Sequence, residues 1–148
     1  DAIASLRNLA RGLFSAPLED SDLTTALEGL AHRSLEDCGI PCEFDCPETI
    51  TISDHYVADQ LYHIAQEAVM NAVKHSGSDL IRIILERSGK NISLRISDNG
   101  TGFDSKEQAN SGLGLYIMPY RAATIGADLE IYPADEGGTV VSCNLLSI

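Results

Sequence analysis

Residues 64–75 of the chain, Ile-Ala-Gln-Glu-Ala-Val-Met-Asn-Ala-Val-Lys-His, decide which fold the sequence adopts. The run is apolar enough for a packed helix, and polar residues interrupt it along one stripe: Glu67, Asn71, Lys74 and His75. Residues three or four positions apart share one face of a helix. A carboxylate, a neutral amide and a cation in this order suit a magnesium-bound nucleotide. The stripe alone is also open to a second interpretation, a solvent-exposed face of an amphipathic helix.

The composition limits the class of protein. A chain of 148 residues, 44% of them hydrophobic, is long enough for one packed core and short for two domains. Its formal net charge of −12, without a basic cluster, argues against nucleic acid as a direct partner. The same charge repels polyphosphate. A nucleotide would therefore need a metal ion, backbone N–H groups and one or two placed cations.

The ends of the chain and its hydropathy bear on location. No apolar run approaches the roughly 20 residues of a membrane span, and no signal peptide is present. We therefore expect no membrane contact by this part of the protein. Because the chain begins with Asp1 rather than Met, we expect it to be part of a longer protein, either membrane-bound or soluble.

Helical and strand patterns alternate along the chain. Helices are predicted at 3–15, 23–37 with Asp22 as cap, 55–76 with Ser53 or Asp54 as cap, and 113–125. Strands are predicted at 42–46, 49–52, 81–87, 91–97, 128–132 and 139–146. This order predicts a two-layer α/β sandwich, with a mixed sheet of about five strands and three main helices on one face.

The four cysteines do not form an obvious metal motif. Cys38, Cys42 and Cys46 recur every fourth residue, but Pro41 and Pro47 make a helix there unfavourable. A metal or redox role is one interpretation, and small buried hydrophobic residues are the favoured one. The fourth cysteine, in the last strand, is predicted to lie in the core.

A second motif, Asp98-Asn-Gly-Thr-Gly102, begins where a half-buried strand ends. A carboxylate at that place can accept a hydrogen bond from the amino group of adenine, whereas guanine offers a carbonyl there. Gly100 and Gly102 allow positive φ angles and a close approach of the backbone to a flat ring. Taken by itself, the motif also fits an ordinary Asp-Asn-Gly turn.

Two more glycine motifs follow. Gly112-Leu113-Gly114-Leu115 directly precedes a predicted helix, and a helix N-terminus binds anions through its free N–H groups. It is not a Walker loop, because no Gly-Lys-Ser/Thr follows, and it lacks the third glycine of a dinucleotide fingerprint. The last motif, Gly137-Gly-Thr139, lies at a turn into the final strand and would usually be a simple hairpin.

Together the four motifs resemble the Bergerat-fold (GHKL) ATPases, the superfamily that holds gyrase, MutL and the histidine kinases. The resemblance covers residues from about 23 to the end. Gly112-Leu-Gly-Leu-Tyr-Ile-Met-Pro-Tyr-Arg-Ala122 is similar to sensor histidine kinases of the nitrate-sensor type, which pair with LuxR-type response regulators. Within that subfamily, residues 1–17 would be the end of the second dimerisation helix and a linker. Residues 18–148 would be the ATPase domain.

The resemblance implies roles for the stripe in the helix at 55–76. Asn71 would ligate Mg²⁺ that bridges the phosphates of ATP, supplying an oxygen without further negative charge. Glu67 would orient metal-bound water or assist proton transfer, which makes Glu67 and Asn71 the catalytic candidates. Lys74 would contact phosphate, and His75 would line the ribose or phosphate region.

The resemblance also implies roles for the remaining motifs. Asp98 would bind adenine, and Thr139 would lie near that contact. The glycines at 100, 102, 112 and 114, with Leu113 and Leu115, would shape a lid that closes over the nucleotide, its mobile part being residues 104–111.

The phosphoacceptor histidine is missing from the chain. In the resembled family this histidine precedes Asp or Glu, whereas the four histidines here precede Arg33, Tyr56, Ile64 and Ser76. We therefore expect the acceptor on an upstream dimerisation domain of the same, homodimeric protein, which would pass the phosphoryl group to a LuxR-type response regulator. His32 and His63 are expected to have solvated or packing roles.

Two other functions stay open on the sequence. One is a serine protein kinase of the anti-sigma-factor type, a compact relative of the same superfamily. The other is a nucleotide-binding regulatory module without phosphotransfer. A gyrase-like or MutL-like enzyme acting on DNA fits least, because the chain has no basic surface.

Overall fold

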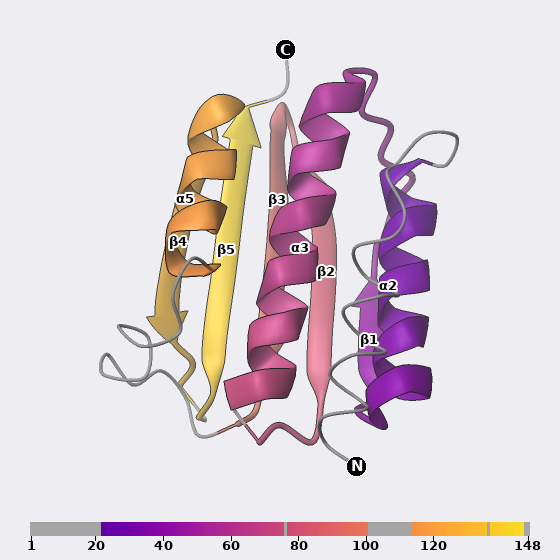
Figure 1. Cartoon of the computed structure of the whole chain (residues 1–148). Coiled ribbons are helices and arrows are strands. Elements are labelled where there is room, and N and C mark those ends of the chain that lie inside the picture. The colour runs from indigo at the N-terminus through magenta and orange to yellow at the C-terminus, as the bar shows by residue number, and fades with distance from the viewer. Residues whose placement is uncertain (1–21, 76, 101–113, 136, 147–148) are drawn as a thin grey trace.

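The sheet of the protein has five strands in the order β1-β2-β3-β5-β4 (Figure 1). The computed structural model describes residues 22–75, 77–100, 114–135 and 137–146, with the backbone alone for 75 and 114–116. The strands are β1 (Cys42–Asp45), β2 (Ile81–Ser88), β3 (Asn91–Asp98), β4 (Asp128–Pro133) and β5 (Thr139–Leu146). β1 and β2 are parallel, and every other neighbouring pair is antiparallel. The predicted mixed sheet is confirmed.

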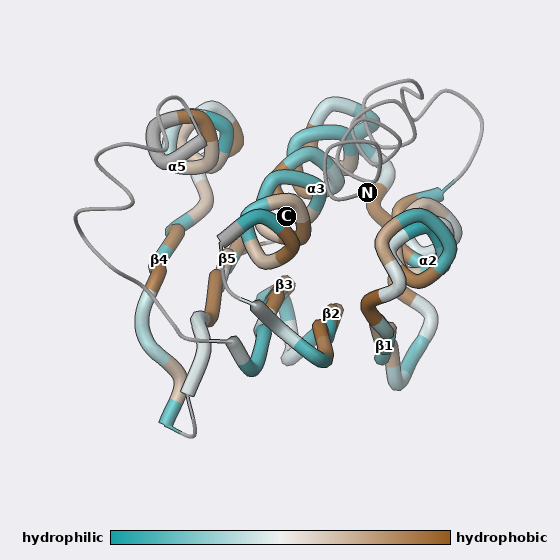
Figure 2. Tube along the Cα trace, turned by 60° about the horizontal axis from the view of Figure 1, so that its bottom comes forward, coloured by the Kyte–Doolittle hydropathy of each residue, from teal (hydrophilic) through white to brown (hydrophobic). Residues whose placement is uncertain are grey.

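In the part of the chain that the structure describes, three helices cover one face of this sheet (Figure 2). They are α2 (Leu23–Cys38), α3 (His55–His75) and α5 (Gly114–Thr124). α3 lies between the other two and packs against both. The largest side chains buried in the core are Leu27, Leu30, Leu61, Ile64, Ile81, Ile83, Leu85, Ile92, Leu94 and Met118. This arrangement confirms the two-layer sandwich; the helix predicted at 3–15 lies outside the described residues.

α2 begins and ends where its sequence predicts. The Asp22 carboxylate accepts a hydrogen bond from the backbone N–H of Thr25 at 2.8 Å, which satisfies one free N–H group of the first turn. That hydrogen bond holds the pKa of the Asp22 carboxyl below its usual value. At the other end, Gly39 takes a φ of 71° and its N–H bonds to the Leu35 carbonyl. A glycine ends helices in this way because it has no Cβ to clash.

α3 is fixed at its start by Asp54, one of the two capping residues predicted. The Asp54 carboxylate accepts hydrogen bonds from the backbone N–H groups of Tyr56 at 2.9 Å and Val57 at 3.3 Å. The turns that follow bury an apolar face, which includes Leu61, Ile64, Ala65, Ala68, Val69 and Ala72. The long predicted helix is therefore confirmed, with its cap assigned to Asp54.

β2 and β3 form a hairpin in which alternate side chains enter the core. Ile81, Ile83 and Leu85 of β2 and Ile92, Leu94 and Ile96 of β3 are buried, because successive residues of a strand point to opposite faces. A two-residue turn, Gly89-Lys90, connects the strands, and Gly89 has a φ of 60°. The alternation determines which side of the hairpin faces the helices.

The predicted strand at residues 49–52 is wrong. No strand is present there, although Ile50 is buried and Ile52 is partly buried, as the alternation predicts. A strand requires backbone hydrogen bonds to a neighbouring strand. An alternating pattern of apolar residues therefore predicts which side chains are buried. A loop can bury the same side chains without any hydrogen bonds to a neighbouring strand. The other predicted strands agree with the observed ones to within about a residue.

Among the described helices, none combines the length and the apolar character that crossing a bilayer requires.

Candidate functional site

The segments that the sequence singles out meet at one end of the two-layer fold (Figure 1). α3 leads into β2, whose first residue, Ile81, pairs with Asp98 at the end of β3. β5 begins at Thr139, one residue before Val140 pairs with Ser97. α5 leads into β4, which begins at the opposite end of the sheet, so the N-terminus of α5 points toward the end that holds Asp98. The topology thus brings four separate segments together.

The polar stripe lies in the last two turns of α3. Glu67 and Asn71 are partly buried and Lys74 is exposed, whereas Ala68 and Ala72 are buried. Within the described part of the chain, the side chains of Glu67 and Asn71 form no hydrogen bond or ion pair. Their oxygens are therefore available to a ligand. The structure describes only the backbone of His75.

Asp98 points to the helix-covered face of the sheet. It continues the alternation of the buried residues Leu94 and Ile96 in β3. One carboxylate oxygen, Oδ1, accepts a hydrogen bond from the backbone N–H of Gly100 at 2.9 Å. That bond fixes the carboxylate at the strand end, while its other oxygen can accept a bond from a ligand. Thr139 continues the alternation of Val141 and Cys143 in β5 and faces the same way.

The Gly137-Gly138 turn packs directly against the Asp98 segment. A Cβ on Gly138 would lie 1.8 Å from the carbonyl oxygen of Asp98 and 3.0 Å from the Cα of Asn99. Gly138 is buried and has a φ of 94°. Only glycine fits here, because a side chain would overlap the backbone and strain the φ angle. Gly138 was absent from the predicted site residues, and the only signal in the sequence is the glycine pair before the last strand.

Asn99 ties the end of α3 to the Asp98 segment. Its side-chain oxygen accepts hydrogen bonds from the backbone N–H groups of Asp79 at 2.8 Å and Leu80 at 3.0 Å. The Asn99 N–H also donates to the Leu80 carbonyl at 3.3 Å. These bonds hold the connection between α3 and β2 beside Asp98. Asn99 was not predicted as a site residue, because a residue in a turn does not reveal a partner 20 positions away.

For several predicted site residues, the structure describes only the backbone or does not describe the residue. Gly102, Gly112 and Leu113 are outside the described residues, and Gly114 and Leu115 are described by their backbone. α5 begins at Gly114, so the second half of the predicted glycine motif, Gly114 and Leu115, forms the start of a helix. The roles of these five residues stay predictions.

The residues of the stripe fit a magnesium ion that arrives with a nucleotide. Mg²⁺ binds oxygen ligands and commonly takes one or two from protein, the rest from phosphates and water. The amide oxygen of Asn71 and the carboxylate of Glu67, one helical turn apart, match that donor set. Among the described residues, no group of three or more His, Cys, Asp or Glu side chains could form a complete metal cage.

The cysteines are free thiols. Cys143 is buried, as predicted, and burial raises the pKa of its thiol to about 11. Cys42 is only partly buried, yet burial and the nearby Glu43 raise the pKa of its thiol to about 12. Cys38 and Cys46 are also partly buried, so the prediction of small buried residues holds only in part for the first three. Raised thiol pKa values disfavour the reactive thiolate.

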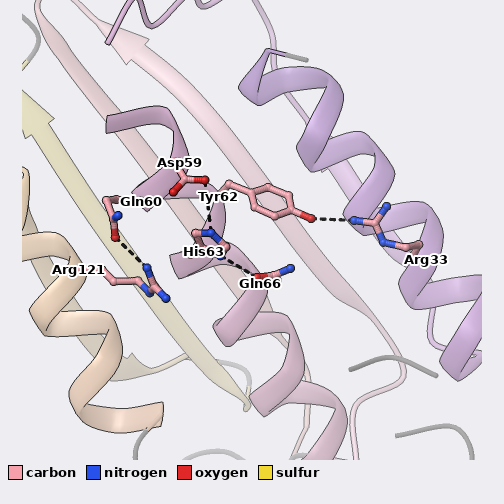
Figure 3. Close-up of polar contacts among 7 residues, drawn as sticks. All are labelled: Arg33, Asp59, Gln60, Tyr62, His63, Gln66 and Arg121. Atoms are coloured by element: carbon pink, nitrogen blue, oxygen red, sulfur yellow. Dashed lines mark hydrogen bonds and ion pairs between the residues drawn. The ribbon is translucent and has the colours of Figure 1, made fainter. Parts of the chain in front are cut away.

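His32 and His63, for which solvated or packing roles were predicted, each interact with neighbours on their own helix. Exposed His32 lies 2.9 Å from the Glu36 carboxylate in the next turn of α2. His63 lies on α3 with its Nδ1 2.9 Å from Gln66 Oε1 and its Nε2 3.4 Å from the Asp59 carboxylate (Figure 3).

A cavity of about 570 Å³ lies at the other end of the sheet. Its lining includes Tyr56 and Val57 at the start of α3, Ile125 after α5, and Leu145 near the end of β5. None of the predicted site residues lines this cavity. It is therefore separate from the Asp98 end.

Comparison with known proteins assigns the fold and the family. The ATP-binding domain of PrrB from Mycobacterium tuberculosis superposes with a TM-score of 0.65 at 23% identity, over 86% of this chain and 96% of that one. The chain thus has the fold of this ATP-binding domain. Residues 56–147 match the family of histidine kinase-, DNA gyrase B-, and HSP90-like ATPases. The chain belongs to this family, and it aligns with part of longer sensor histidine kinases.

Two longer relatives align along almost the whole chain. Sensor histidine kinase MctS from Rhizobium johnstonii is 32% identical over 144 residues, and oxygen sensor histidine kinase NreB from Staphylococcus carnosus is 28% identical over 141 residues. Each alignment covers 95% of this chain. The chain spans 31% of the length of MctS and 41% of the length of NreB.

Proposed function

We propose that this chain binds Mg-ATP between α3 and the Asp98 end of the sheet, and donates the γ-phosphoryl group to a histidine on a separate dimerisation domain. One observation carries the proposal. The Gly137-Gly138 turn packs against the backbone of Asp98, and the Asp98 side chain points to the face of the sheet that α3 covers. A nucleotide bound there would contact both α3 and the Asp98 end of the sheet.

Asp98 binds adenine in this proposal. Its Oδ1 already accepts the Gly100 N–H, so the other oxygen is directed to the exocyclic amino group of the base. Guanine presents a carbonyl at that position, which would leave both acceptors unpaired. Thr139 faces the same way from the neighbouring strand and lies beside this contact.

The last two turns of α3 form the phosphate side. Asn71, with Glu67 one turn earlier, would hold Mg²⁺, which when bound neutralises phosphate charge. Asn71 supplies its oxygen without adding negative charge, and Lys74 and His75 add positive charge or hydrogen-bond donors. Glu67 would orient a water molecule or assist proton transfer at the attacking group.

The glycine motifs complete the site. Gly100 and Gly102 follow the base-binding carboxylate, and Gly112, Leu113, Gly114 and Leu115 lead into α5. Free N–H groups at the start of a helix bind phosphate. The segment between the motifs would close over the nucleotide as a lid. Phosphoryl transfer then depends mainly on positioning and charge neutralisation, since the acceptor supplies the nucleophile.

The parent protein is proposed to be a homodimeric sensor kinase of the nitrate-sensor type. Both longer relatives carry the name sensor histidine kinase, and the chain spans less than half of each. Residues 1–17 would be the end of the second dimerisation helix and linker, and residues 18–148 the ATPase domain. The domain would act in the cytoplasm, and a LuxR-type response regulator would receive the phosphoryl group.

Calorimetry with Mg-ATP and the variant Asn71→Asp tests the nucleotide site. A second negative charge beside the triphosphate should weaken ATP binding about tenfold. Asn91→Asp, in the exposed hairpin at the other end of the sheet, is the matched control and should leave affinity unchanged. Equal affinities for ATP and GTP in the wild type, or no effect of Asn71→Asp, would contradict the assignment.

Phosphotransfer separates the proposal from an anti-sigma-type serine kinase. The chain is mixed with labelled Mg-ATP and the dimerisation domain of MctS, the relative with the higher identity. A phosphohistidine product is lost in acid and stable in base, whereas phosphoserine behaves in the opposite way. An acid-stable product would favour the serine kinase, and binding of ATP without transfer would favour a regulatory module.

A further inference from the structure

A partly buried hydrogen bond joins α5 to α3 (Figure 3). It lies nearer the start of α3 than Glu67 and Asn71 do. Arg121 of α5 donates from Nη1 to Oε1 of Gln60 in α3 at 3.0 Å. Gln60 is only 8% exposed. A buried acceptor that loses its donor also loses the water that could replace it. The bond therefore opposes any shift of α5 along α3.

α5 needs such a contact because its own hydrogen bonding is interrupted. Pro119 lies in the middle of this 11-residue helix. It has no N–H to donate to the carbonyl of Leu115, and its ring crowds that carbonyl. One backbone hydrogen bond is therefore missing at the centre of α5, although residues 114–124 still form one continuous helix. Contacts with the rest of the fold must determine where α5 lies.

Those contacts lie in the second half of α5 and beside Pro119. Met118 and Ala122 are each 1% exposed. The Ala122 carbonyl accepts a hydrogen bond from the Ala127 N–H at 2.9 Å, and Gly126 takes a φ of 69° to end the helix. Arg121 lies inside this anchored half. Its bond to Gln60 adds a directional contact to the apolar packing.

We infer that Arg121 and Gln60 are positioning residues for the phosphates of ATP. Neither touches the nucleotide in the proposed site. The bond between them holds the anchored half of α5 against α3, and so sets where the N-terminus of α5 lies relative to Asn71. This inference rests on the proposed function, because the N-terminus of α5 matters only if phosphates bind there.

The test compares a ligand that has phosphates with one that lacks them. Binding of Mg-ATP and of adenosine to the whole chain is measured by calorimetry and by NMR titration. The variants are Gln60→Met, which keeps the shape and removes the acceptor, Arg121→Met, and the pair combined. Arg82→Met is the matched control, because Arg82 pairs with exposed Glu43 at 3.0 Å at the far edge of the sheet.

Gln60→Met and Arg121→Met should each weaken ATP about fivefold, the value of one partly buried hydrogen bond, with adenosine affinity unchanged. The double variant should be no weaker than either single one, because both remove the same bond. Gln60→Glu keeps an acceptor for Arg121 and should therefore bind ATP as tightly as the wild type. Arg82→Met should change neither ligand.

Equal losses for ATP and adenosine, or no loss, would overturn the inference, since the pair would then serve only to stabilise the fold. Thermal unfolding of each variant identifies that case. Failure of the wild type to bind ATP would instead contradict the proposed function, so the two failures are distinguishable.

Discussion

In the described part of the chain, the two ends of the sheet contain the same two local features, but only at one end do these features contact each other. Each end has a hairpin with glycine at positive φ, Gly138 at one end and Gly89 at the other. Each also has a polar side chain that accepts two backbone N–H groups, Asn99 and Asp54 respectively. Among the described residues at the Gly89 end, each feature contacts only those close to it in sequence. At the Gly138 end they meet at Asp98 and Asn99, and this contact brings the two turns together at the proposed nucleotide site.

The largest expected effect comes from adding one methyl group at each hairpin. Gly138→Ala places a Cβ against the Asp98 carbonyl, and Gly89→Ala places it where nothing lies within 4 Å. Both variants force alanine into positive φ, which costs about 1 kcal/mol. Gly138→Ala adds steric overlap, so its free energy of unfolding should fall by about 3 kcal/mol. Urea denaturation measures the difference, and equal losses would show that the two hairpins are equivalent.

A second pair compares the carboxylates of the two ends. Asp98→Asn keeps one oxygen to accept the Gly100 N–H, but it replaces the second carboxylate oxygen with an NH2 group, which cannot accept a hydrogen bond from adenine. The affinity for ATP should therefore fall about 30-fold. The preference for ATP over GTP should shrink with it. Asp54→Asn should leave affinity unchanged, because asparagine caps a helix about as well as aspartate. Competition binding with both nucleotides measures this, and an unchanged preference in Asp98→Asn would remove Asp98 from the base site.

A third pair removes the polar side chains that bind two N–H groups. Asn99→Ala and Asp54→Ala should each lower the free energy of unfolding by about 1 kcal/mol, since both lose acceptors near the surface. Only Asn99→Ala should also weaken ATP, about threefold, because it frees the end of α3 beside Asp98. Parallel unfolding and calorimetry give both numbers. A loss of affinity in Asp54→Ala would contradict the division between the ends.

The smallest effect is a pH dependence from two thiols, Cys42 at the Asp98 end and Cys143 in the middle of β5. Burial raises their pKa values from the usual 9.0 to about 12 and about 11. The unfolded state therefore loses these thiol protons at a lower pH than the folded state does. The free energy of unfolding is not reduced by the two thiols below pH 9, and it falls as the pH rises from 9 to 11 or 12. Unfolding followed against pH should show a shallower fall in Cys143→Ala. An identical slope would mean that this thiol does not contribute.

Much of the fold was predictable because its signals are local. Asp22 caps α2 and Gly39 ends it through contacts within a few residues. The alternation of β2 and β3 predicts their buried face for the same reason. The error at residues 49–52 has the opposite cause, since strand pairing depends on a neighbour that a local pattern does not identify.

The site was predictable in its residue types and less so in its connections. Glu67, Asn71 and Asp98 were chosen because the four motifs together resemble those of a known superfamily, whereas each motif alone also fits a solvated helix face or an ordinary turn. Gly138, Asn99 and the Arg121–Gln60 pair were not chosen. Each acts through a partner 19 to 61 residues away in sequence, and only the folded chain brings these partners together.

The sequence by itself determined the helices, most of the strands and the chemistry available to a nucleotide. Those features follow from spacing, caps and side-chain type, which neighbouring residues decide. Only the tertiary structure decided that the Gly137-Gly138 turn lies against Asp98, that Asn99 holds the end of α3, and that Arg121 bonds to Gln60. Hydrogen bonds and close contacts between distant segments depend on positions in space to within an ångström, and the order of residues along a chain does not specify these positions.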